Sequence, residues 1–446
     1  MGSTTYQQLK KNYRSKQILI VGLGVLGGGI GLAKFFSGIG AKVIVTDKKT
    51  SNQLAPALEQ LKNYPIKYRL GGHPHEIFPQ ADVIFKGPFV PWDLPQIVEA
   101  ERIGIPVEME LSFFAKHFPG KLIGITGTRG KSTTTMMIYE LLKRSGWRIH
   151  LGGSLPHVST INYLKSLTDG DWVVMELPSW PLSAFHRNKI SPHIGIFTNF
   201  YPDHLNFYQS LDDYLEDKKA IYLYQTRNDY LVVNKSLSYT ITKDHPRSKI
   251  IYFDYQDFPS GLDHLQGKHN LENAAAALTV AKLLKLDVNR SINTIKKFKG
   301  VPFRQQIVAK KAGMIFINDT TSTTPIATIK ALAAFSDKKI LLILGGNSKN
   351  LPAGTLIKDL ARAEKIILLA GSFTQEILPQ LKQIYPDKIS QVFDNLQAAV
   401  NKACDLAAGY KDPVYILFSP GATSFAMFNN EFHRGGEFNK IISKLP

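Results

Sequence analysis

Short apolar runs alternate with amphipathic segments along almost the whole of this 446-residue chain. The runs are rich in Ile, Val and Leu, and most of them end in a Gly, Asp or Asn turn before a helical pattern begins. Because strand and helix patterns alternate in this way, the sequence predicts α/β layers with mainly parallel sheets. The expected strands are at residues 17–21, 41–47, 81–87, 121–127, 172–177, 193–199, 229–234, 312–319, 338–346, 364–371 and 412–420.

Breaks in this pattern divide the chain into three expected domains. Residues 1–118 are expected to form a Rossmann-like N-terminal domain, residues 119–300 a central domain with a mainly parallel sheet, and residues 301–446 a C-terminal Rossmann-like α/β domain. The last element of the central domain is expected to be the helix after "GKHNLENAAAALTVAKLL". The segment "FKGVPFRQQ" is expected to be a linker, because Gly300 and Pro302 interrupt the helical pattern.

A glycine-rich turn follows the first expected strand. Gly22, Gly24 and Gly27 form a G-x-G-x-x-G pattern, and Asp47 ends the next expected strand. Glycines allow a backbone turn to approach phosphate, and the following helix offers free N–H groups and the positive end of its dipole. The pattern is typical of a nucleotide site, with NAD as the default ligand. Tight packing of the strand against the helix, with no ligand, is the alternative.

A second phosphate-binding pattern, "GITGTRGKSTTT", begins the central domain. Its glycines would let backbone N–H groups face phosphate oxygens, Lys131 would supply a mobile positive charge, and the Ser132 hydroxyl would bind Mg²⁺. The spacing is a variant, because a strict phosphate loop has Gly where Ile125 stands. We therefore expect a nucleoside-triphosphate site of the P-loop ATPase type.

A carboxylate is expected beside this loop as a second Mg²⁺ ligand. Glu176 ends the strand pattern in "WVVMELPSW" and is the natural candidate. Taken alone, Glu176 would equally suit an ordinary carboxylate at the end of a strand.

The charge balance and the single cysteine narrow the class of protein. The chain has 54 Lys and Arg against 36 Asp and Glu, a net charge of +18, which favours anionic partners. Its basic residues are scattered rather than gathered into a tract, so a generally basic surface is a better interpretation than nucleic-acid binding. Cys404, the one cysteine, cannot form an internal disulfide, and a reducing compartment fits best.

An uncharged run at residues 17–33 superficially resembles a signal peptide, because basic residues precede it. Six glycines interrupt the run, and it is shorter than the roughly 20 apolar residues of a membrane span. A strand, a turn and the start of a helix explain it better. We expect a soluble, cytoplasmic protein without membrane contact.

Several motifs follow one another in a fixed order: "GITGTRGKSTTT", "ELPS", "TNFYPDHLNFY", "GKHNLENAAAA", "IND" and "SPGATSF". In this order they resemble the Mur ligases, and the similarity runs from Lys16 to Phe438. The ending "FSPGATSFAMFNNEFHRGGEF" is similar to that of the member that adds D-glutamate to a UDP-linked muramoyl-alanine. The resemblance implies a monomeric, three-domain, ATP-dependent amide ligase of peptidoglycan precursor synthesis, in which a carboxylate becomes an acyl phosphate before an amine displaces phosphate.

The resemblance also assigns roles at the ATP site. Ser132 and Glu176 would hold one Mg²⁺, and His204 would ligate a second or lie close to the acyl phosphate. Lys218 matches a lysine that these ligases carbamylate with CO₂, which would make it an anionic Mg²⁺ ligand; from spacing alone, it would lie on a solvated helix face. The implied catalytic residues are Lys131, His204 and Lys218. The implied ATP-binding residues are Thr128, Arg129, Gly130, Lys131, Ser132, Thr133, Thr134, His269, Asn270, Asn273, Arg304 and Asp319.

At the start of its helix, Asn270 would serve equally well as a cap. Arg304 and Asp319 match positions that reach from the third domain to the phosphate and ribose, which would couple catalysis to domain closure. D-Glutamate, a dicarboxylate that suits a lysine and hydroxyl donors, would contact Thr323, Lys349, Ser424 and Phe425. The UDP-linked muramoyl precursor would contact Gly22, Gly24, Val25, Leu26, Asp47, Lys48 and Lys49.

Some positions depart from the family pattern. Arg129 replaces an Asn in the phosphate loop, and Asn206 replaces the usual Asp after D-H-L. The other departures are Phe89 for Gly, Ser154 for Asn, Pro178 for Ser, Pro181 for Gln and Thr321 for Lys. Because proline supplies neither a side-chain hydrogen bond nor an N–H, these changes leave the identity of the acceptor open.

Three alternatives therefore stand beside the expected ligase. A related amide ligase that acts on another carboxylate or amino acid would keep the same ATP chemistry. An NAD-dependent oxidoreductase would use the first glycine turn and leave the phosphate loop idle. A nucleic-acid-stimulated ATPase would use the net positive charge.

Overall fold

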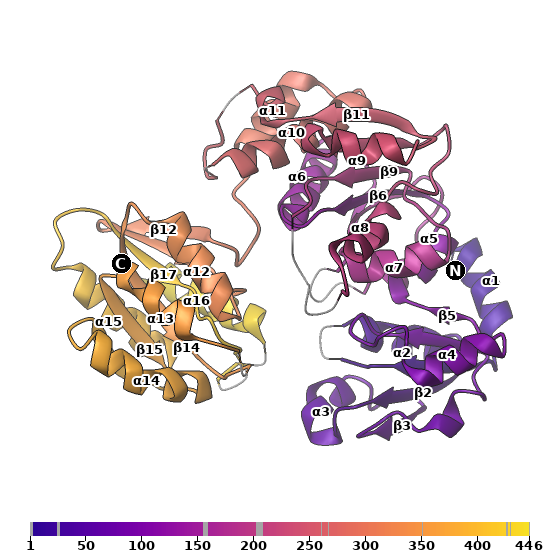
Figure 1. Cartoon of the computed structure of the whole chain (residues 1–446), viewed down its shortest axis with the longest axis horizontal. Helices are drawn as coiled ribbons and strands as arrows, with labels where there is room; N and C mark the ends of the chain where they lie inside the picture. Colours follow the sequence, from indigo (N-terminus) through magenta and orange to yellow (C-terminus); the bar gives the residue numbers. More distant parts are fainter. Residues whose placement is uncertain are drawn as a thin grey trace. The chain divides into compact units, whose positions relative to one another are not determined.

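The computed structural model describes residues 3–24, 27–154, 159–201, 208–259, 261–265, 267–349, 351–424, 427–428 and 430–445. The chain forms two compact units, Met1–Phe298 and Lys299–Pro446 (Figure 1). Two sheets lie in the first unit and one in the second. One sheet thus corresponds to each of the three expected domains, and the expected α/β fold class is confirmed.

The first sheet is Rossmann-like, with five parallel strands in the order β3-β2-β1-β4-β5. Its central strand, β1 (Gln17–Val21), is apolar after its first residue because helices cover both faces of a parallel sheet. The remaining elements are α1 (Thr4–Tyr13), α2 (Gly28–Gly38), β2 (Lys42–Asp47), α3 (Ser51–Glu59), β3 (Ile66–Leu70), η1 (His75–Ile77), β4 (Val83–Lys86), α4 (Pro95–Arg102), β5 (Val107–Glu108) and α5 (Glu110–His117).

The second sheet has six parallel strands in the order β11-β10-β9-β6-β8-β7. β6 (Lys121–Thr126) lies between β8 and β9, and the register sets Ile125 beside Glu176. The other elements are α6 (Lys131–Arg144), β7 (Ile149–Gly153), η2 (Thr160–Lys165), β8 (Trp172–Glu176), α7 (Ser179–Arg187), β9 (Ile194–Phe197), α8 (Leu211–Lys219), β10 (Tyr230–Asn234), η3 (Lys235–Leu237), α9 (Ser238–Lys243), β11 (Lys249–Phe253), η4 (Tyr255–Asp257), α10 (Lys268–Leu283) and α11 (Val288–Lys296).

The third sheet, in the second unit, has the order β12-β13-β17-β14-β15-β16. β12 is antiparallel to β13, and the other pairs are parallel. Apolar side chains form a core on each face of this sheet. Its elements are β12 (Gln306–Lys311), β13 (Met314–Asn318), α12 (Pro325–Ala334), β14 (Lys339–Gly345), α13 (Gly354–Asp359), η5 (Leu360–Arg362), β15 (Lys365–Leu369), α14 (Ser372–Ile384), β16 (Ile389–Phe393), α15 (Leu396–Ala407), β17 (Val414–Phe418) and α16 (Glu431–Lys444).

All the strands that the hydrophobic pattern predicts are present, and the structure adds six that it does not predict: β3, β5, β7, β11, β12 and β16. Every added strand is an edge strand of its sheet. An edge strand pairs on one side only, so its residues are less buried and its apolar run is interrupted, as in "IKYRL" of β3. Gln306, expected in the linker, begins one of them, β12.

The two sheets of the first unit share one hydrophobic core. The same cluster of buried side chains includes Phe36 and Phe113 near the first sheet, and Val173 and Leu182 near the second. The two sheets are therefore joined by packed apolar side chains, and such cores resist deformation. Within the described residues, no helix is both long and apolar enough to cross a bilayer.

Phe36 is the centre of an aromatic cluster in this core, and its removal should be costly. Its ring centroid lies 4.9–5.6 Å from those of Tyr13, Phe35, Phe85 and Phe113. Phe36→Ala should lower the free energy of unfolding by about 3–5 kcal/mol, because the cavity cannot collapse completely. Urea denaturation followed by circular dichroism would measure the loss.

Tyr239→Ala is the control for this prediction, because Tyr239 is 72% exposed. It should change the free energy of unfolding by no more than about 0.5 kcal/mol. If Phe36→Ala changed it as little, the aromatic cluster would not be important for stability.

Candidate functional site

The turn between β6 and α6 contains two glycines that no other residue could replace without strain. Gly127 has φ 144° and Gly130 has φ 81°, values that residues with a Cβ rarely adopt. A Cβ on Gly127 would overlap the hydroxyl oxygen of Thr198, and a Cβ on Gly130 would overlap the amide oxygen of Asn273. α6 begins directly after Gly130, and N–H groups in its first turn have no partner within the helix. This is the geometry of an anion site.

The residues that follow β9 hold this turn in shape. Thr198 Oγ1 donates to the carbonyl oxygen of Arg129 at 2.7 Å. Asn199 forms two bonds with the same residue: its Oδ1 accepts from Arg129 N at 2.9 Å, and its Nδ2 donates to Arg129 O at 3.1 Å. The Thr128 N–H donates to the carbonyl of Asn199 at 3.0 Å. The loop is therefore ordered by the protein itself.

Lys131 carries a positive charge back across the turn. It is the first residue of α6, and its Nζ donates to the carbonyl oxygens of Gly127 and Thr128, both at 3.0 Å. An anion at the helix N-terminus would meet the helix dipole and this ammonium together.

Ser132 and Glu176 meet beside the same turn. Ser132 is in the first turn of α6, Glu176 ends β8, and the Ser132 hydroxyl donates to Glu176 Oε2 at 2.6 Å. Both residues are buried. Mg²⁺ in nucleotide sites binds one or two protein oxygens and completes its shell with phosphate and water oxygens. A hydroxyl and a carboxylate at this distance fit such an ion.

Lys218 reaches the turn from α8. It is 1% exposed, so the alternative that places it on a solvated helix face is wrong. Its Nζ donates to the carbonyl of Gly127 at 2.9 Å and lies 4.6 Å from the ring centroid of Tyr214. α8 carries this lysine inward because Tyr214, one turn earlier on the same helix face, is also buried.

The start of α10 lies on the other side of the turn. Thr134 Oγ1 donates to Asn273 Oδ1 at 3.2 Å, and Asn273 Nδ2 donates to Asn270 Oδ1 at 3.4 Å. Asn270 does not cap the helix, because Gly267 is the N-cap residue. Burial lowers the pKa of His269, helped by the charge of Arg129 and opposed by Glu272.

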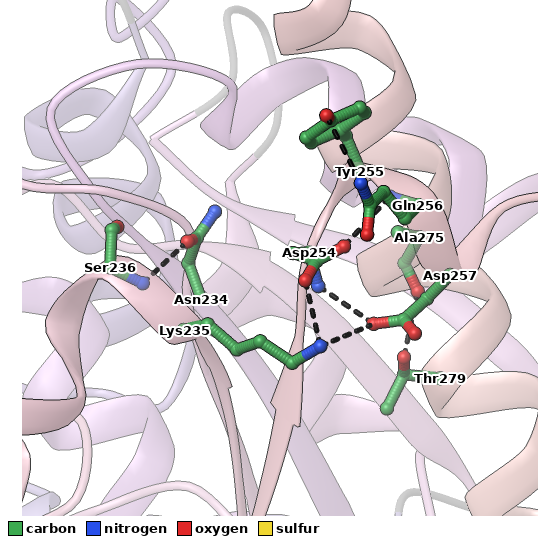
Figure 2. Close-up of polar contacts among 9 residues, drawn as sticks. All are labelled: Asn234, Lys235, Ser236, Asp254, Tyr255, Gln256, Asp257, Ala275 and Thr279. Atoms are coloured by element: carbon green, nitrogen blue, oxygen red, sulfur yellow. Dashed lines mark hydrogen bonds and ion pairs between the residues drawn. The ribbon is translucent and has the colours of Figure 1, made fainter.

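A polar cluster at the ends of β10 and β11 supports this helix (Figure 2). Lys235 Nζ lies 2.7 Å from Asp254 Oδ2 and 4.0 Å from Asp257 Oδ2, and the Asp254 N–H donates to Asp257 at 2.8 Å. These contacts close the chain into η4, which packs on α10. The Lys268 amine, in the first turn of α10, lies 4.3 Å from the ring centroid of Tyr255 in η4. The cluster thus fixes the end of α10 that faces the phosphate turn.

The glycine turn of the first sheet is joined to the end of β2. Asp47 Oδ2 accepts from the Gly24 N–H at 3.2 Å, and Oδ1 accepts from the Lys49 N–H at 2.9 Å. A Cβ on Gly22 would lie 2.9 Å from Val90. The carboxylate that a dinucleotide site would direct at a ribose is therefore bonded to backbone. The turn is closely packed at Gly22, whereas among the described residues the space beside Gly24 is open.

Asp319, at the end of β13, is the buried carboxylate of the second unit. Its Oδ2 accepts from the hydroxyls of Ser322 at 2.6 Å and Ser419 at 2.7 Å, and its Oδ1 accepts from the Gln305 N–H at 3.1 Å. Burial raises the pKa of Asp319 to about 6, while the serine hydrogen bonds and the charge of Arg304 oppose the shift. The carboxylate is therefore mostly ionised at neutral pH.

The four residues expected to bind the amino acid belong to the same unit, and the structure describes three of them. Lys349 Nζ donates to Thr323 Oγ1 at 2.9 Å. Ser424 is 3% exposed, and its hydroxyl has no hydrogen-bond partner within the described residues. A buried hydroxyl without a partner is costly, and a bound ligand could supply one.

The guanidinium of Arg434 ties two segments of this site together. It is 1% exposed and donates to Thr320 Oγ1 at 2.9 Å, to Thr320 O at 2.8 Å and to Ala422 O at 3.2 Å. Burial lowers its pKa to about 10 and the Glu431 carboxylate opposes this shift, so the group stays charged at neutral pH.

The structure describes the surroundings of four residues that depart from the family pattern. Pro178 is the N-cap residue of α7, and Pro181 is in its first turn, where the missing N–H has no helical partner to lose. The Ser154 N–H donates to Glu176 O at 3.0 Å. Phe89 is 69% exposed and contacts the Trp180 ring edge-on, with 5.1 Å between centroids.

Another departure, Thr321, donates from its hydroxyl to the carbonyl oxygen of Phe303 at 2.8 Å. Asn206 lies outside the described residues. Arg304, expected at the phosphates, is exposed on the second unit. Four expected site residues lie outside the described residues: Val25, Leu26, His204 and Phe425. In the part of the chain that the structure describes, no group of three or more His, Cys, Asp or Glu side chains could hold a metal.

The sequence did not reveal the residues that support the site. Thr198 and Asn199 belong to the recognised "TNFYPDHLNFY" motif, and their place after a predicted strand was the available signal. Arg434 belongs to the recognised ending "FSPGATSFAMFNNEFHRGGEF", but its sequence position did not indicate that it is buried. Tyr214 gave no signal of its own, because an aromatic residue on a helix is most often an ordinary packing residue.

Family models match two parts of the chain. The Mur ligase middle domain matches residues 125–260, which include the phosphate turn and Glu176. The N-terminal domain described as Mur ligase, MurD-like, matches residues 16–108, which form the first sheet.

Relatives and solved structures agree with these matches. UDP-N-acetylmuramoylalanine–D-glutamate ligase of Borreliella afzelii (strain PKo) is 32% identical over 97% of this chain and 98% of the relative. The ligase of the same name from Roseiflexus sp. (strain RS-1) is 31% identical over 96% and 99%. The structure of UDP-N-acetylmuramate-alanine ligase MurC from Thermotoga maritima, 21% identical, covers 96% of this chain and 99% of that one with a TM-score of 0.56. The chain belongs to the Mur ligase family.

Proposed function

We propose that this protein is an ATP-dependent amide ligase that adds D-glutamate to UDP-N-acetylmuramoyl-L-alanine in peptidoglycan precursor synthesis. The observation that carries the proposal is the meeting of Lys131, Ser132 and Glu176 at the phosphate turn, in a chain whose full-length relatives bear that ligase's name. It would act in the cytoplasm as a monomer, with ATP and Mg²⁺.

Lys131 and the first turn of α6 would bind the β- and γ-phosphates, because together they supply N–H donors and a mobile positive charge. Ser132 and Glu176 would hold Mg²⁺. The ion would screen the negative charge that builds up as carboxylate and triphosphate approach one another.

The reaction would proceed in two displacements. A carboxylate oxygen of the muramoyl-alanine attacks the γ-phosphorus of ATP, and ADP leaves. The amine of D-glutamate then attacks the carbonyl carbon of the acyl phosphate, inorganic phosphate leaves, and the amine loses a proton. Thr128, Arg129, Thr133 and Thr134 of the turn and of α6, and His269, Asn270 and Asn273 of α10, would form the rest of the nucleotide site.

The two substrates would bind on the first and third sheets. The glycine turn, with Asp47, Lys48 and Lys49, would hold the UDP end of the precursor. Asp319 and Arg304 would act on the nucleotide from the second unit. Lys349, Thr323, Ser424 and Phe425 would receive the glutamate carboxylates, because a lysine and hydroxyl donors suit a dicarboxylate.

Lys218 would act as a carbamate. A carbamate forms when the neutral amine attacks CO₂ and releases a proton, and it exchanges a cation for an anion that Mg²⁺ accepts as a ligand. Together with His204 it would serve a second ion.

A ligase for another acceptor is the second candidate, because Pro178 and Pro181 stand at the start of α7, directly after Glu176. Prolines there donate no hydrogen bond to a substrate.

The first prediction concerns the whole reaction and the charge on Lys131. With ATP and Mg²⁺, phosphate release should require both UDP-N-acetylmuramoyl-L-alanine and D-glutamate. Lys131→Ala should lower kcat by about 10²–10³-fold, the usual loss when one preorganised charge partner is removed. A phosphate-release assay across UDP-muramoyl precursors and D- or L-amino acids would measure both effects.

Full activity with a different acceptor would favour the second candidate. If the chain neither bound nor consumed ATP with any acceptor, the ligase assignment would be wrong.

A second prediction tests the form of Lys218. Lys218→Arg keeps a cation near Gly127 but cannot form the carbamate, so it should lose activity as fully as Lys218→Ala and bind Mg²⁺ about 10–100-fold more weakly. Removal of dissolved CO₂ should lower the activity of the unmodified protein. Lys219→Arg, the neighbouring lysine, is the control and should remain active. An active Lys218→Arg variant would show that a cation suffices there.

A third prediction concerns the amino-acid site. Lys349→Ala should remove a charged hydrogen bond to a glutamate carboxylate, a loss of about 1.5–3 kcal/mol. This corresponds to roughly a 10–100-fold rise in KM for D-glutamate, with the KM for ATP unchanged. Lys339→Ala, at the opposite end of β14, is the control. Equal KM values for D-glutamate in the two variants would show that Lys349 does not bind the glutamate.

A further inference from the structure

The loop between β4 and α4 joins the two sheets of the first unit through Trp92. The indole Nε1–H of Trp92 donates to Ser183 Oγ, on α7, at 2.8 Å. Ser183 Oγ in turn donates to the carbonyl oxygen of Trp180, one turn earlier, at 2.6 Å. A side chain from the β4–α4 loop is therefore hydrogen-bonded to the first turns of α7.

The ring of Trp92 is also held on its faces. The amine of Lys86, which ends β4, lies 4.3 Å from the ring centroid, and the guanidinium carbon of Arg187, which ends α7, lies 4.2 Å from it. Arg187 also bonds Glu101 of α4 at 2.9 Å. A cation over an indole face is attracted by the ring electrons, more strongly where water is excluded. The indole is thus fixed in orientation and in position.

The contact between Trp92 and α7 matters because α7 lies close to Glu176 in sequence. α7 begins three residues after Glu176, the carboxylate beside the phosphate turn. Trp92 lies in the loop that follows β4, and β4 is the neighbour of β1, whose end carries the glycine turn. The loop therefore connects the proposed UDP edge of the first sheet to the proposed Mg²⁺ edge of the second.

We propose that Trp92 is a positioning residue that sets the distance between these two edges, so that a carboxylate bound through the first sheet arrives at the γ-phosphate. The inference rests on the proposed ligase function. Among the described residues, the hydrogen bond and cation contacts of Trp92 are with Ser183, Lys86 and Arg187, so it acts through Ser183 and α7.

Three variants separate its contacts. Trp92→Phe keeps an aromatic ring between Lys86 and Arg187 but loses the N–H donor. Ser183→Ala removes the acceptor and leaves the indole. Trp92→Ala removes both the aromatic ring and the N–H donor. Trp147→Phe is the matched control, because Trp147 contacts Trp172 near the amino ends of β7 and β8, at the opposite edge of the sheet.

The expected signature is loss of ligation without loss of binding at either edge. Trp92→Ala should lower kcat for ligation by about 10–100-fold, since small displacements of reacting groups have effects of that size. The affinities for ATP and for free UDP, each measured alone by calorimetry, should stay within about threefold of the unmodified protein, because each ligand needs only one edge. Trp92→Phe and Ser183→Ala should each cause a smaller loss, and their combination should be no worse than the larger of the two, because they break one bond.

A second readout does not depend on the reaction. In Trp92→Ala the two sheets of the first unit should unfold in two thermal transitions rather than one, and Trp147→Phe should retain one. This measurement keeps its meaning even if the ligase assignment fails, so the two failures can be told apart.

Unchanged kcat together with a single transition in Trp92→Ala would overturn the proposal. A parallel loss of ATP affinity would also overturn it, because Trp92 would then be a general structural residue. If Trp92→Ala does not fold, Trp92→Phe and Ser183→Ala decide the question by the same kcat and affinity measurements.

Discussion

The turn at residues 127–130 is held in one shape from three directions, and the proposed chemistry depends on this constraint. Thr198 and Asn199 bond it from the end of β9, Lys218 from α8, and Asn273 closes against it from α10. Since the protein has already fixed these groups in folding, little reorganisation is needed when phosphate binds. Preorganised donors of this kind stabilise developing charge more effectively than mobile ones. The glycines are needed because neighbouring side chains occupy the space that a Cβ would take.

A ligase must bring three reactants together. In this chain two of the three sheets belong to one compact unit and the third forms another. The first two sheets share a continuous core, so the glycine turn of the first sheet and the phosphate turn of the second belong to one packed unit. The third sheet has its own cores and forms a separate compact unit. Its polar cluster is organised without help from the other sheets, because the buried Arg434 and Asp319 find their partners within the unit.

The charged side chains near the phosphate turn bond to neutral groups of the protein. Lys131 and Lys218 both donate to backbone oxygens of the turn. Glu176 accepts from a neutral hydroxyl, and no lysine among the described residues forms an ion pair with it. A carboxylate that is not neutralised by a protein cation is available to a metal ion. The net charge of +18 is dispersed over the surface in many exposed lysines, which is consistent with small anionic substrates and requires no nucleic-acid partner.

The sequence alone determined the interior strands, the α/β class and the positions of both glycine turns, because buried parallel strands are continuous apolar runs and glycine is required where φ is positive. It also supplied Lys131 and Ser132, since their motif is local, and Glu176, since it ends a predicted strand. Tertiary structure decided the rest. The six edge strands form through pairing with a neighbour, not through their own interrupted pattern. Spacing alone would place Lys218 on the surface, and only the family motif assigned it to the site; the fold buries it beside Tyr214. Asp47 and Asn270 acquire their backbone and side-chain partners only in the folded chain. Contacts between residues distant in sequence cannot be seen in periodicity, because that pattern reports which face is buried and not what lies against it.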